Sequence, residues 1–242
     1  MYRLREMPPT RHLEFIHSPL HTVKAAQSIP THGVAIRAAI FRTIDENPHL
    51  LVLQRASTDS MPNRWEFPGG GVDDQDGSIK DALYREIREE TGLTATWIVQ
   101  EVGNGQRWQN RRNEECLCIT FVVEVEEVEL MERSIHAITN AAPTGDEGGD
   151  ATRKFPDSHR VETQAIPAST TTTTTRQDEL ASVPVKLSAA EHQRYLWLSE
   201  DEIRERCGGG RERLEFTSED TRECMLQAFA VQKEVIAARK TI

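Results

Sequence analysis

Apolar residues recur at helical spacing near the middle of the chain, at positions i, i+3, i+4 and i+8 of one segment. These positions are Ile79, Ala82, Leu83 and Ile87. Such spacing places a single apolar stripe along an α-helix. Ser78 is a suitable N-cap with Asp81 near the capping-box position, and Gly92 suits the left-handed residue that ends a helix. The pattern therefore predicts a helix between Ser78 and Gly92.

Continuous apolar and β-branched runs predict strands on both sides of this helix. Two runs precede it, at residues 33–41 and 50–55, and turn residues at 45–48 separate them. The runs that follow the helix are residues 97–102, 116–125 and 195–198. A polar loop is expected between the first two of these later runs.

Two further helices are expected near the C-terminal end of the sequence. Acidic residues directly after Ser199 are typical of the first turn of a helix, and residues 216–240 form a partly apolar pattern that Thr217 or Ser218 could cap. Strands interleaved with helices indicate an α/β fold, an α/β/α sandwich around a mixed β-sheet.

A low-complexity tract interrupts this pattern from about residue 132 to residue 184. It contains a Gly- and Asp-rich stretch and an unbroken run of threonines at residues 170–175, with few aromatic residues. Such a composition buries too little apolar surface to offset the entropy of ordering, so we expect a long disordered insertion. Because residues 195–198 read as a strand, we expect one domain at residues 31–242 that the tract interrupts, after an N-terminal extension at residues 1–30.

Composition narrows the class of protein. The first thirty residues lack the apolar segment of a secretory signal, and no run approaches the roughly 18 apolar residues of a membrane span, so we expect a cytoplasmic protein, with a nuclear location left open. The net charge of −10 argues against a nucleic acid polymer as partner but not against a nucleotide that arrives with a metal ion. The four cysteines lack CxxC spacing and are expected to be reduced thiols.

Three acids of the predicted helix point to chemistry. Glu86, Glu89 and Glu90 are related by steps of three and four residues, which places their carboxylates on one face. They stand in the last turn, where the helix dipole disfavours each acid by about 0.3–1 kcal/mol. A solvated charged face balanced by Arg85 and Arg88 is the simpler interpretation. The Gly-rich turn and short acidic loop before the helix favour a site for Mg²⁺ or Mn²⁺, which take oxygen ligands.

Residues 67–93 resemble the Nudix family signature, Gly-x5-Glu-x7-Arg-Glu-U-x-Glu-Glu-x-Gly-U with U aliphatic. The second half matches at every position from Arg85 to Leu93. The first half departs from it, because counting back from Arg85 puts Gly77 where the family has its first Glu. Counting forward from the Gly-rich turn puts Asp76 there, with one extra residue before the helix. We interpret this as an inserted loop residue.

The resemblance implies a metal-dependent hydrolase that cleaves the diphosphate linkage of a nucleoside triphosphate or another nucleoside diphosphate-linked compound. It implies Mg²⁺ (or Mn²⁺) held by the three glutamates together with the backbone carbonyl of Gly69. Glu89 would act in catalysis, and Arg85 would orient the carboxylates. Family members also commonly form homodimers, and no membrane partner is implied.

In the same family, pyrophosphohydrolases that clean oxidised nucleotides carry a late-loop acid six residues before a Trp. Glu191 stands six before Trp197 here and is a candidate metal ligand or base, although it could equally be a solvated loop acid. His192 is a weaker candidate for proton transfer.

Arg55 occupies the position from which those relatives reach substrate phosphate, with a surface role as the alternative. Trp65 and Trp108 could stack on a base or pack in the core. The opposing interpretation of the whole chain is a catalytically weak Nudix module that binds a nucleotide and acts as a regulatory or interaction protein.

Overall fold

The computed structural model describes residues 14–26, 33–110, 112–126, 185–209 and 212–241. The predicted disordered insertion falls on residues 127–184, which lie outside the described residues, as does most of the predicted N-terminal extension. Among the helices that the structure describes, none is both long and apolar enough to cross a membrane.

Seven strands of the described chain form one mixed sheet. They are β1 (Gly33–Ile44), β2 (Asn47–Arg55), β3 (Trp65–Glu66), β4 (Gly69–Gly71), β5 (Ala95–Gln109), β6 (Glu115–Val125) and β7 (His192–Leu198). The order is β3-β2-β1-β6-β5, with β4 paired to β1 and β7 paired to β2. β1 and β6 run parallel, and the other pairs are antiparallel. The two parallel strands lie at the centre of the order, which explains their nearly continuous apolar runs.

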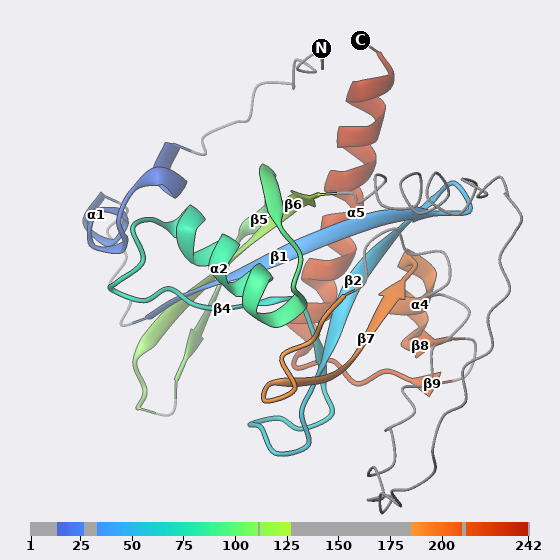
Figure 1. The fold of residues 1–242 in the computed structure, drawn as a ribbon, viewed down its shortest axis with the longest axis horizontal. Coiled ribbons are helices and arrows are strands. Elements are labelled where there is room, and N and C mark those ends of the chain that lie inside the picture. The colour runs from blue at the N-terminus through green and yellow to red at the C-terminus, as the bar shows by residue number, and fades with distance from the viewer. Residues whose placement is uncertain (1–13, 27–32, 111, 127–184, 210–211, 242) are drawn as a thin grey trace, which may run out of the picture. The chain divides into compact units, whose positions relative to one another are not determined.

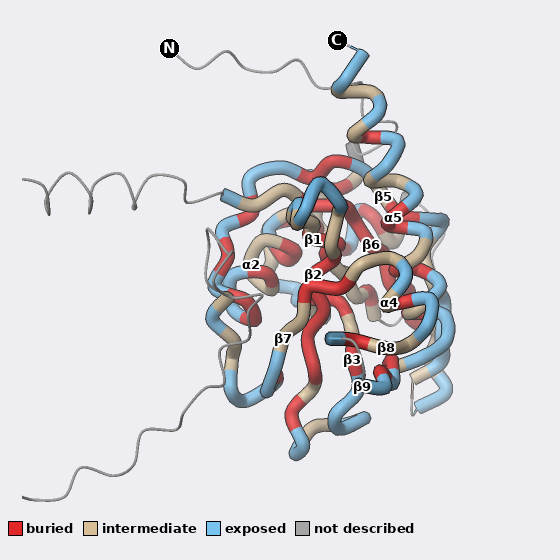
Figure 2. Tube along the Cα trace, turned by 90° about the vertical axis from the view of Figure 1, so that its right-hand side faces the viewer, coloured by how far each residue is buried: buried red, intermediate tan, exposed pale blue. Residues whose placement is uncertain are grey.

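Helices cover both faces of this sheet. They are the 3₁₀ helix η1 (Glu14–His17) and the α-helices α1 (Leu20–Ala26), α2 (Ile79–Thr91), α4 (Glu200–Glu205) and α5 (Glu219–Lys240). In Figure 1, α2 crosses in front of the sheet and α5 lies behind it. Figure 2 shows the buried positions along the strands and most exposed positions in the connections. The predicted α/β/α sandwich around a mixed sheet is confirmed.

The helix α2 forms as its sequence predicts. The Ser78 hydroxyl accepts a hydrogen bond from the backbone N–H of Asp81, and Gly92 adopts φ 68° at the C-terminal end. Its apolar stripe, from Ile79 to Ile87, is fully buried. Both end signals and the stripe were local, so the bounds agree with the prediction to within one residue.

Each face of the sheet has its own apolar cluster. The cluster beneath α2 includes Leu51, Leu53 and Leu83, and the cluster beneath α5 includes Val52 and Phe229. Leu51 and Val52 are neighbours on β2 but belong to opposite clusters, as the alternation of side chains along a strand requires.

The N-terminal segment, predicted as an extension, contributes apolar side chains to the core. Ile16, Leu20 and Val23 are buried in the cluster beneath α2, and the ring of Phe15 lies 6.3 Å from that of Phe121. Residues of η1 and α1 therefore complete the core, and the domain begins before residue 31.

Three short features differ from the sequence prediction. The strand β5 continues to Gln109 through the segment expected as a polar loop, because irregular pairing around Gly103 and Gly105, both at positive φ, keeps it beside β6. The predicted Gly-rich turn contains β4, which pairs with β1. A small two-stranded sheet joins β8 (Cys207–Gly208) to β9 (Glu212–Arg213).

The strand β7 returns to the same sheet as the strands before residue 127, since it pairs with β2 along most of its length. Residues 127–184 therefore interrupt one sheet. The two flanking backbones meet at the end of α2: the N–H of Glu126 donates to the carbonyl of Thr94, and the N–H of Lys186 donates to that of Thr91.

Candidate functional site

The carboxylates of α2 differ sharply in their surroundings. Glu90 is only 5% exposed, and one of its oxygens accepts a 2.7 Å hydrogen bond from the backbone N–H of Gly69. Glu86 is half-buried beside Gly70, whereas the side chain of Glu89 is 59% exposed. The solvated-face interpretation therefore fits Glu89 but not Glu90.

Two glycines allow the chain before α2 to approach these acids. Gly69 adopts φ 143°, and a Cβ placed on it would lie 2.1 Å from the carbonyl oxygen of Ile36. A Cβ on Gly70 would lie 2.6 Å from a carboxylate oxygen of Glu86. Gly69 must be glycine, and at Gly70 a side chain would displace the Glu86 carboxylate, so the two glycines let β4 run directly against the acids.

Arg85 links the acidic groups around it. Its guanidinium donates to both oxygens of Asp76 at 3.0 and 2.9 Å, to Glu86 at 2.8 Å, to Glu89 at 3.2 Å and to the carbonyl of Gly71 at 3.1 Å. The hydrogen bonds from Arg85 lower the pKa of Asp76. Arg85 therefore joins Asp76, Glu86 and Glu89 in one hydrogen-bonded cluster, and its orienting role stays a prediction.

The chain that re-enters the fold after residue 184 runs across the C-terminal end of α2. The N–H of Lys186 donates to Thr91, and that of Ser188 donates to the carbonyl of Glu90 at 3.3 Å. A turn after Ser188 brings the following residues to the acidic face of the helix.

This turn brings Glu191 and His192 beside Glu90. One ligand atom from each of the three side chains can be chosen so that all lie within 4.8 Å of one another. The carbonyl of Glu191 accepts a 2.7 Å hydrogen bond from the N–H of Ala56, which ties the turn to the end of β2. The structure thus joins Glu191 to the carboxylates of the signature, a proximity that sequence could not establish.

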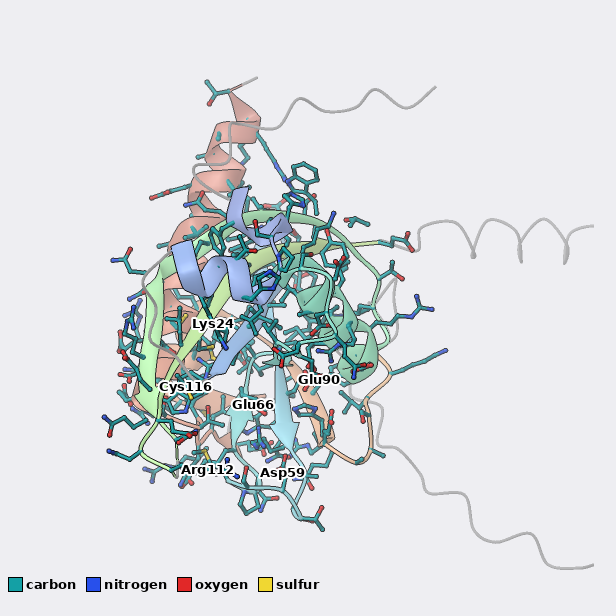
Figure 3. The ribbon with its side chains drawn as sticks, turned by 90° about the vertical axis from the view of Figure 1, so that its left-hand side faces the viewer. Lys24, Asp59, Glu66, Glu90, Arg112 and Cys116 are labelled. Carbon is teal, nitrogen blue, oxygen red and sulfur yellow. The ribbon has the colours of Figure 1, made fainter. Side chains whose placement is uncertain are left out.

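His192 is buried, with 3% of its surface exposed. Its Nε2 lies 3.3 Å from a carboxylate oxygen of Glu66, and its Nδ1 lies 3.9 Å from an oxygen of Glu90. Nδ1 has no hydrogen-bond partner among the described residues. Figure 3 shows Glu66 and Glu90 close together at this site. Sequence reasoning missed Glu66, and its only signal was its place in the run before the Gly-rich turn.

Burial and like charge both perturb the acids. Burial, reinforced by the nearby charges of Glu86, Glu66 and Glu191, raises the pKa of Glu90 to about 9 despite the hydrogen bond from Gly69. Burial likewise raises the pKa of Glu86, with the charges of neighbouring acids adding to it and Arg85 opposing it. Convergent carboxylates and an unpaired imidazole nitrogen form a donor set suited to a divalent cation. These residues could hold Mg²⁺ or Mn²⁺.

The predicted substrate residues have other contacts in the structure. Arg55 donates to Glu66 and Asp59, at 2.6 Å each. Burial lowers the pKa of Arg55, but these two carboxylates outweigh that effect and raise it. Trp65 is 1% exposed and packs in the cluster beneath α5, which favours the packing alternative for this residue, whereas Trp108 is exposed.

A separate cavity of about 700 Å³ lies away from these acids. Its lining includes Trp65 and also Arg64 and Arg213, but none of Glu86, Glu90 and Glu191. The cavity is therefore not the carboxylate site.

Comparison with known proteins agrees with this arrangement. Residues 32–139 match the family model described as NUDIX domain. Residues 32–139 of this chain are a NUDIX domain. The matched range contains α2 and its carboxylates, and the second contribution to the site, from Glu191 and His192, lies beyond it.

Distant NUDIX relatives are pyrophosphohydrolases. The RNA pyrophosphohydrolase of Campylobacter jejuni is 44% identical over 46 residues, which are 19% of this chain and 29% of the relative. The CTP pyrophosphohydrolase of Escherichia coli is 39% identical over 64 residues, which are 26% of this chain and 46% of the relative. The matches span less than half the length of these curated relatives.

A solved structure is also similar. The NUDIX domain of Shewanella oneidensis NrtR, in complex with ADP ribose, has a TM-score of 0.48 and 13% identity, covering 87% of this chain and 97% of that one.

Proposed function

We propose that this NUDIX chain is a metal-dependent pyrophosphohydrolase that cleaves the diphosphate linkage of a nucleoside triphosphate or another nucleoside diphosphate-linked compound. The observation that carries the proposal is the buried Glu90 carboxylate, which faces Glu191 and His192 on one side and Glu86 on its own helix. Nothing in the described chain neutralises Glu90 by an ion pair closer than the 3.9 Å to His192.

A buried acid of this kind gains most from a cation. Its elevated pKa means that the site without metal retains a proton, and a divalent ion would replace that proton. When bound, Mg²⁺ supplies charge neutralisation on phosphate oxygens and lowers the pKa of a water that attacks phosphorus. The acids of α2, with the carbonyl of Gly69 as a further donor, are the proposed ligands.

The remaining roles follow from position. Arg85 holds Glu86 and Glu89 in place while its other contacts go to Asp76 and Gly71. Glu89 is an exposed acid beside the buried ones, and we propose that it accepts a proton from a water at the mouth of the site. Arg55 would reach a substrate phosphate only by exchanging one of its carboxylate partners.

A nucleoside triphosphate is the favoured substrate class. Two of the distant relatives are a CTP pyrophosphohydrolase and an RNA pyrophosphohydrolase, and CTP is itself a nucleoside triphosphate. A net charge of −10 disfavours long contacts to a nucleic acid polymer, so we favour the free nucleotide.

The alternative is a module that binds a nucleotide without cleaving it. The departure of the signature at its first Glu is the observation that favours it. The contact of Asp76 with Arg85 weakens that objection, because an acid does meet the arginine.

The test is product chromatography with Mg²⁺ or Mn²⁺ on nucleoside triphosphates, nucleotide-linked diphosphates and a 5′-triphosphate RNA. The wild type should cleave at least one of them, and Glu89→Gln and Glu86→Gln should reduce the rate at least about 100-fold. Glu115→Gln is the matched control, since Glu115 pairs with Arg107 away from the site.

Two results would count against the hydrolase. One is the absence of turnover on the whole panel together with nucleotide binding that survives Glu89→Gln, which would favour the binding module. The other is turnover that persists in both α2 variants, which would place the chemistry elsewhere.

A further inference from the structure

We propose that His192 is a ligand of the cation at this site, together with Glu90 and Glu191, and that its imidazole makes the site prefer Mn²⁺ over Mg²⁺. This inference rests on the proposed use of a metal but concerns the identity of the ligand and the ion. It adds a nitrogen donor to what the signature alone would make an all-oxygen set.

The first support is the unpaired nitrogen. Nδ1 of His192 is buried, finds no hydrogen-bond partner in the part of the chain that the structure describes, and faces Glu90 at 3.9 Å. A buried polar atom without a partner is destabilising, so a role that fills its lone pair is expected. Glu90 and Glu191 converge on the same space.

The separation of these atoms suits one ion. Ligand atoms about 2.0–2.2 Å from a shared cation lie roughly 3–4.4 Å apart. The observed limit of 4.8 Å between the ligand atoms of Glu90, Glu191 and His192 is close to that range. Because Glu191 is exposed, its side chain can close the difference by rotation.

The second support lies on the other side of the ring. Nε2 of His192 is 3.3 Å from Glu66, whose carboxylate also accepts a hydrogen bond from Arg55. An ionised carboxylate can only accept, so Nε2 carries the proton and the lone pair of a neutral ring falls on Nδ1. Histidines that bind metals usually donate their second N–H to a carboxylate in this manner. Glu66 thus orients the ring, and Arg55 holds Glu66.

A competing arrangement is a charged His192 that serves only as an ion-pair partner between Glu66 and Glu90. It requires both ring nitrogens to carry protons, yet the 3.9 Å separation between Nδ1 and Glu90 exceeds hydrogen-bond length. Metal coordination explains both the gap and the convergence of Glu191.

The choice of ion follows from the donor. Imidazole nitrogen binds first-row transition ions well, whereas Mg²⁺ favours oxygen ligands and keeps its waters. A site with one imidazole and two carboxylates should therefore select Mn²⁺ over Mg²⁺ when both compete.

The experiment is pulsed electron paramagnetic resonance on full-length protein loaded with Mn²⁺ alone. Electron spin echo modulation from ¹⁴N reports a nitrogen in the first coordination sphere. The wild type should show it, and His192→Gln should remove it and weaken Mn²⁺ binding about 10-fold or more, with a smaller change for Mg²⁺. His49→Gln is the matched control, because Nδ1 of His49 lies 3.1 Å from the carbonyl of nearby Asn47 in an exposed contact.

A second variant guards against misfolding at the buried histidine. Glu191→Gln changes an exposed side chain and should weaken Mn²⁺ binding while the ¹⁴N modulation persists. The inference is overturned if wild-type protein binds no Mn²⁺, if bound Mn²⁺ shows no ¹⁴N modulation, or if the modulation survives in His192→Gln. Because these readouts need no substrate, hydrolysis with Mg²⁺ but without ¹⁴N coupling would reject this inference alone. Coupling without hydrolysis would reject only the hydrolase.

Discussion

Replacement of Glu90 by Gln should stabilise the protein without metal at neutral pH. Glu90 is buried beside other acids, and its pKa rises to about 9 in the folded state, against a usual value of 4.5. Between those two values the folded state holds a proton that the unfolded state has lost, so stability falls as pH rises. A glutamine keeps an oxygen for the N–H of Gly69 and removes this penalty.

The magnitude follows from the same linkage. pH 7 lies about 2.5 units above the usual pKa of 4.5 that the carboxyl has in the unfolded chain. At about 1.36 kcal/mol per unit, keeping the proton on Glu90 lowers the stability of the folded state by about 3 kcal/mol. The amide of glutamine must also find a partner among the acids, so we expect a gain of about 1–3 kcal/mol. At pH 5 the gain should shrink to about 0.7 kcal/mol, because pH 5 is only about half a unit above the unfolded-state pKa of 4.5.

Urea unfolding of wild type and Glu90→Gln at pH 5 and pH 7, with chelator, measures both gains. Glu89→Gln serves as the control and should change stability by less than about 0.5 kcal/mol, because its side chain is largely exposed. Added Mn²⁺ should raise the stability of the wild type more than that of Glu90→Gln. A variant less stable than wild type at pH 7, or a gain larger at pH 5 than at pH 7, would refute the reasoning.

Three further predictions concern the frame of the site. Gly69→Ala should destabilise the fold by at least about 1–3 kcal/mol in thermal or urea unfolding, because its φ of 143° and its contact with Ile36 exclude a side chain, whereas Gly71→Ala, which meets open space, should change little. An equal loss in both variants would contradict this. Asp76→Ala should lower kcat about 10-fold or more, because Arg85 loses its two hydrogen bonds to Asp76. Asp73→Ala should stay near wild type, because the Asp73 carboxylate is exposed and 3.9 Å from Arg85. Equal steady-state hydrolysis rates for the two variants would contradict the proposed role of Asp76. Replacing residues 127–184 by a short Gly/Ser linker should preserve folding and metal binding, because the backbone N–H groups of Glu126 and Lys186 bond to carbonyls only three residues apart. Loss of the circular dichroism signature of the folded chain would show that the segment is needed.

Local signals made α2 predictable. Its stripe, its Ser78 cap and its Gly92 terminus lie within fifteen consecutive positions, and each acts on neighbouring backbone. The long strands were visible for the same reason, since β1 and β6 are continuous apolar runs. By contrast, β3 and β4 contain only two and three residues, too few to carry a periodic signal, and exist because longer strands offer them partners.

The N-terminal segment was missed because its apolar residues are sparse. Ile16, Leu20 and Val23 stand at i, i+4 and i+7, a helical spacing, but only these three positions carry it and they are divided between η1 and α1. They fill the core beside α2. A stripe this short is a weak signal, because α1 has only seven residues and owes its stability to packing against the core.

The site itself divides in the same way. The sequence groups three acids, Glu86, Glu89 and Glu90, because a helix fixes their spacing. It does not show that Glu90 is buried whereas Glu89 is exposed. His192 and Glu66 come from strands 126 positions apart and could not be paired without the fold. What joins them is β2, which pairs with both β3 and β7: Glu66 lies opposite Leu53 and His192 opposite Arg55, two positions of β2 that share a face.

That pairing also explains how a long interruption of the chain leaves the site intact. Lys186 and Ser188 bond to the last carbonyls of α2, and Glu191 bonds to Ala56 at the end of β2. The turn that carries Glu191 and His192 is therefore fixed at both ends by backbone hydrogen bonds to elements that precede residue 127. Because these bonds join described residues, we expect α2 and β2 to set the position of the proposed ligands whatever the length of residues 127–184.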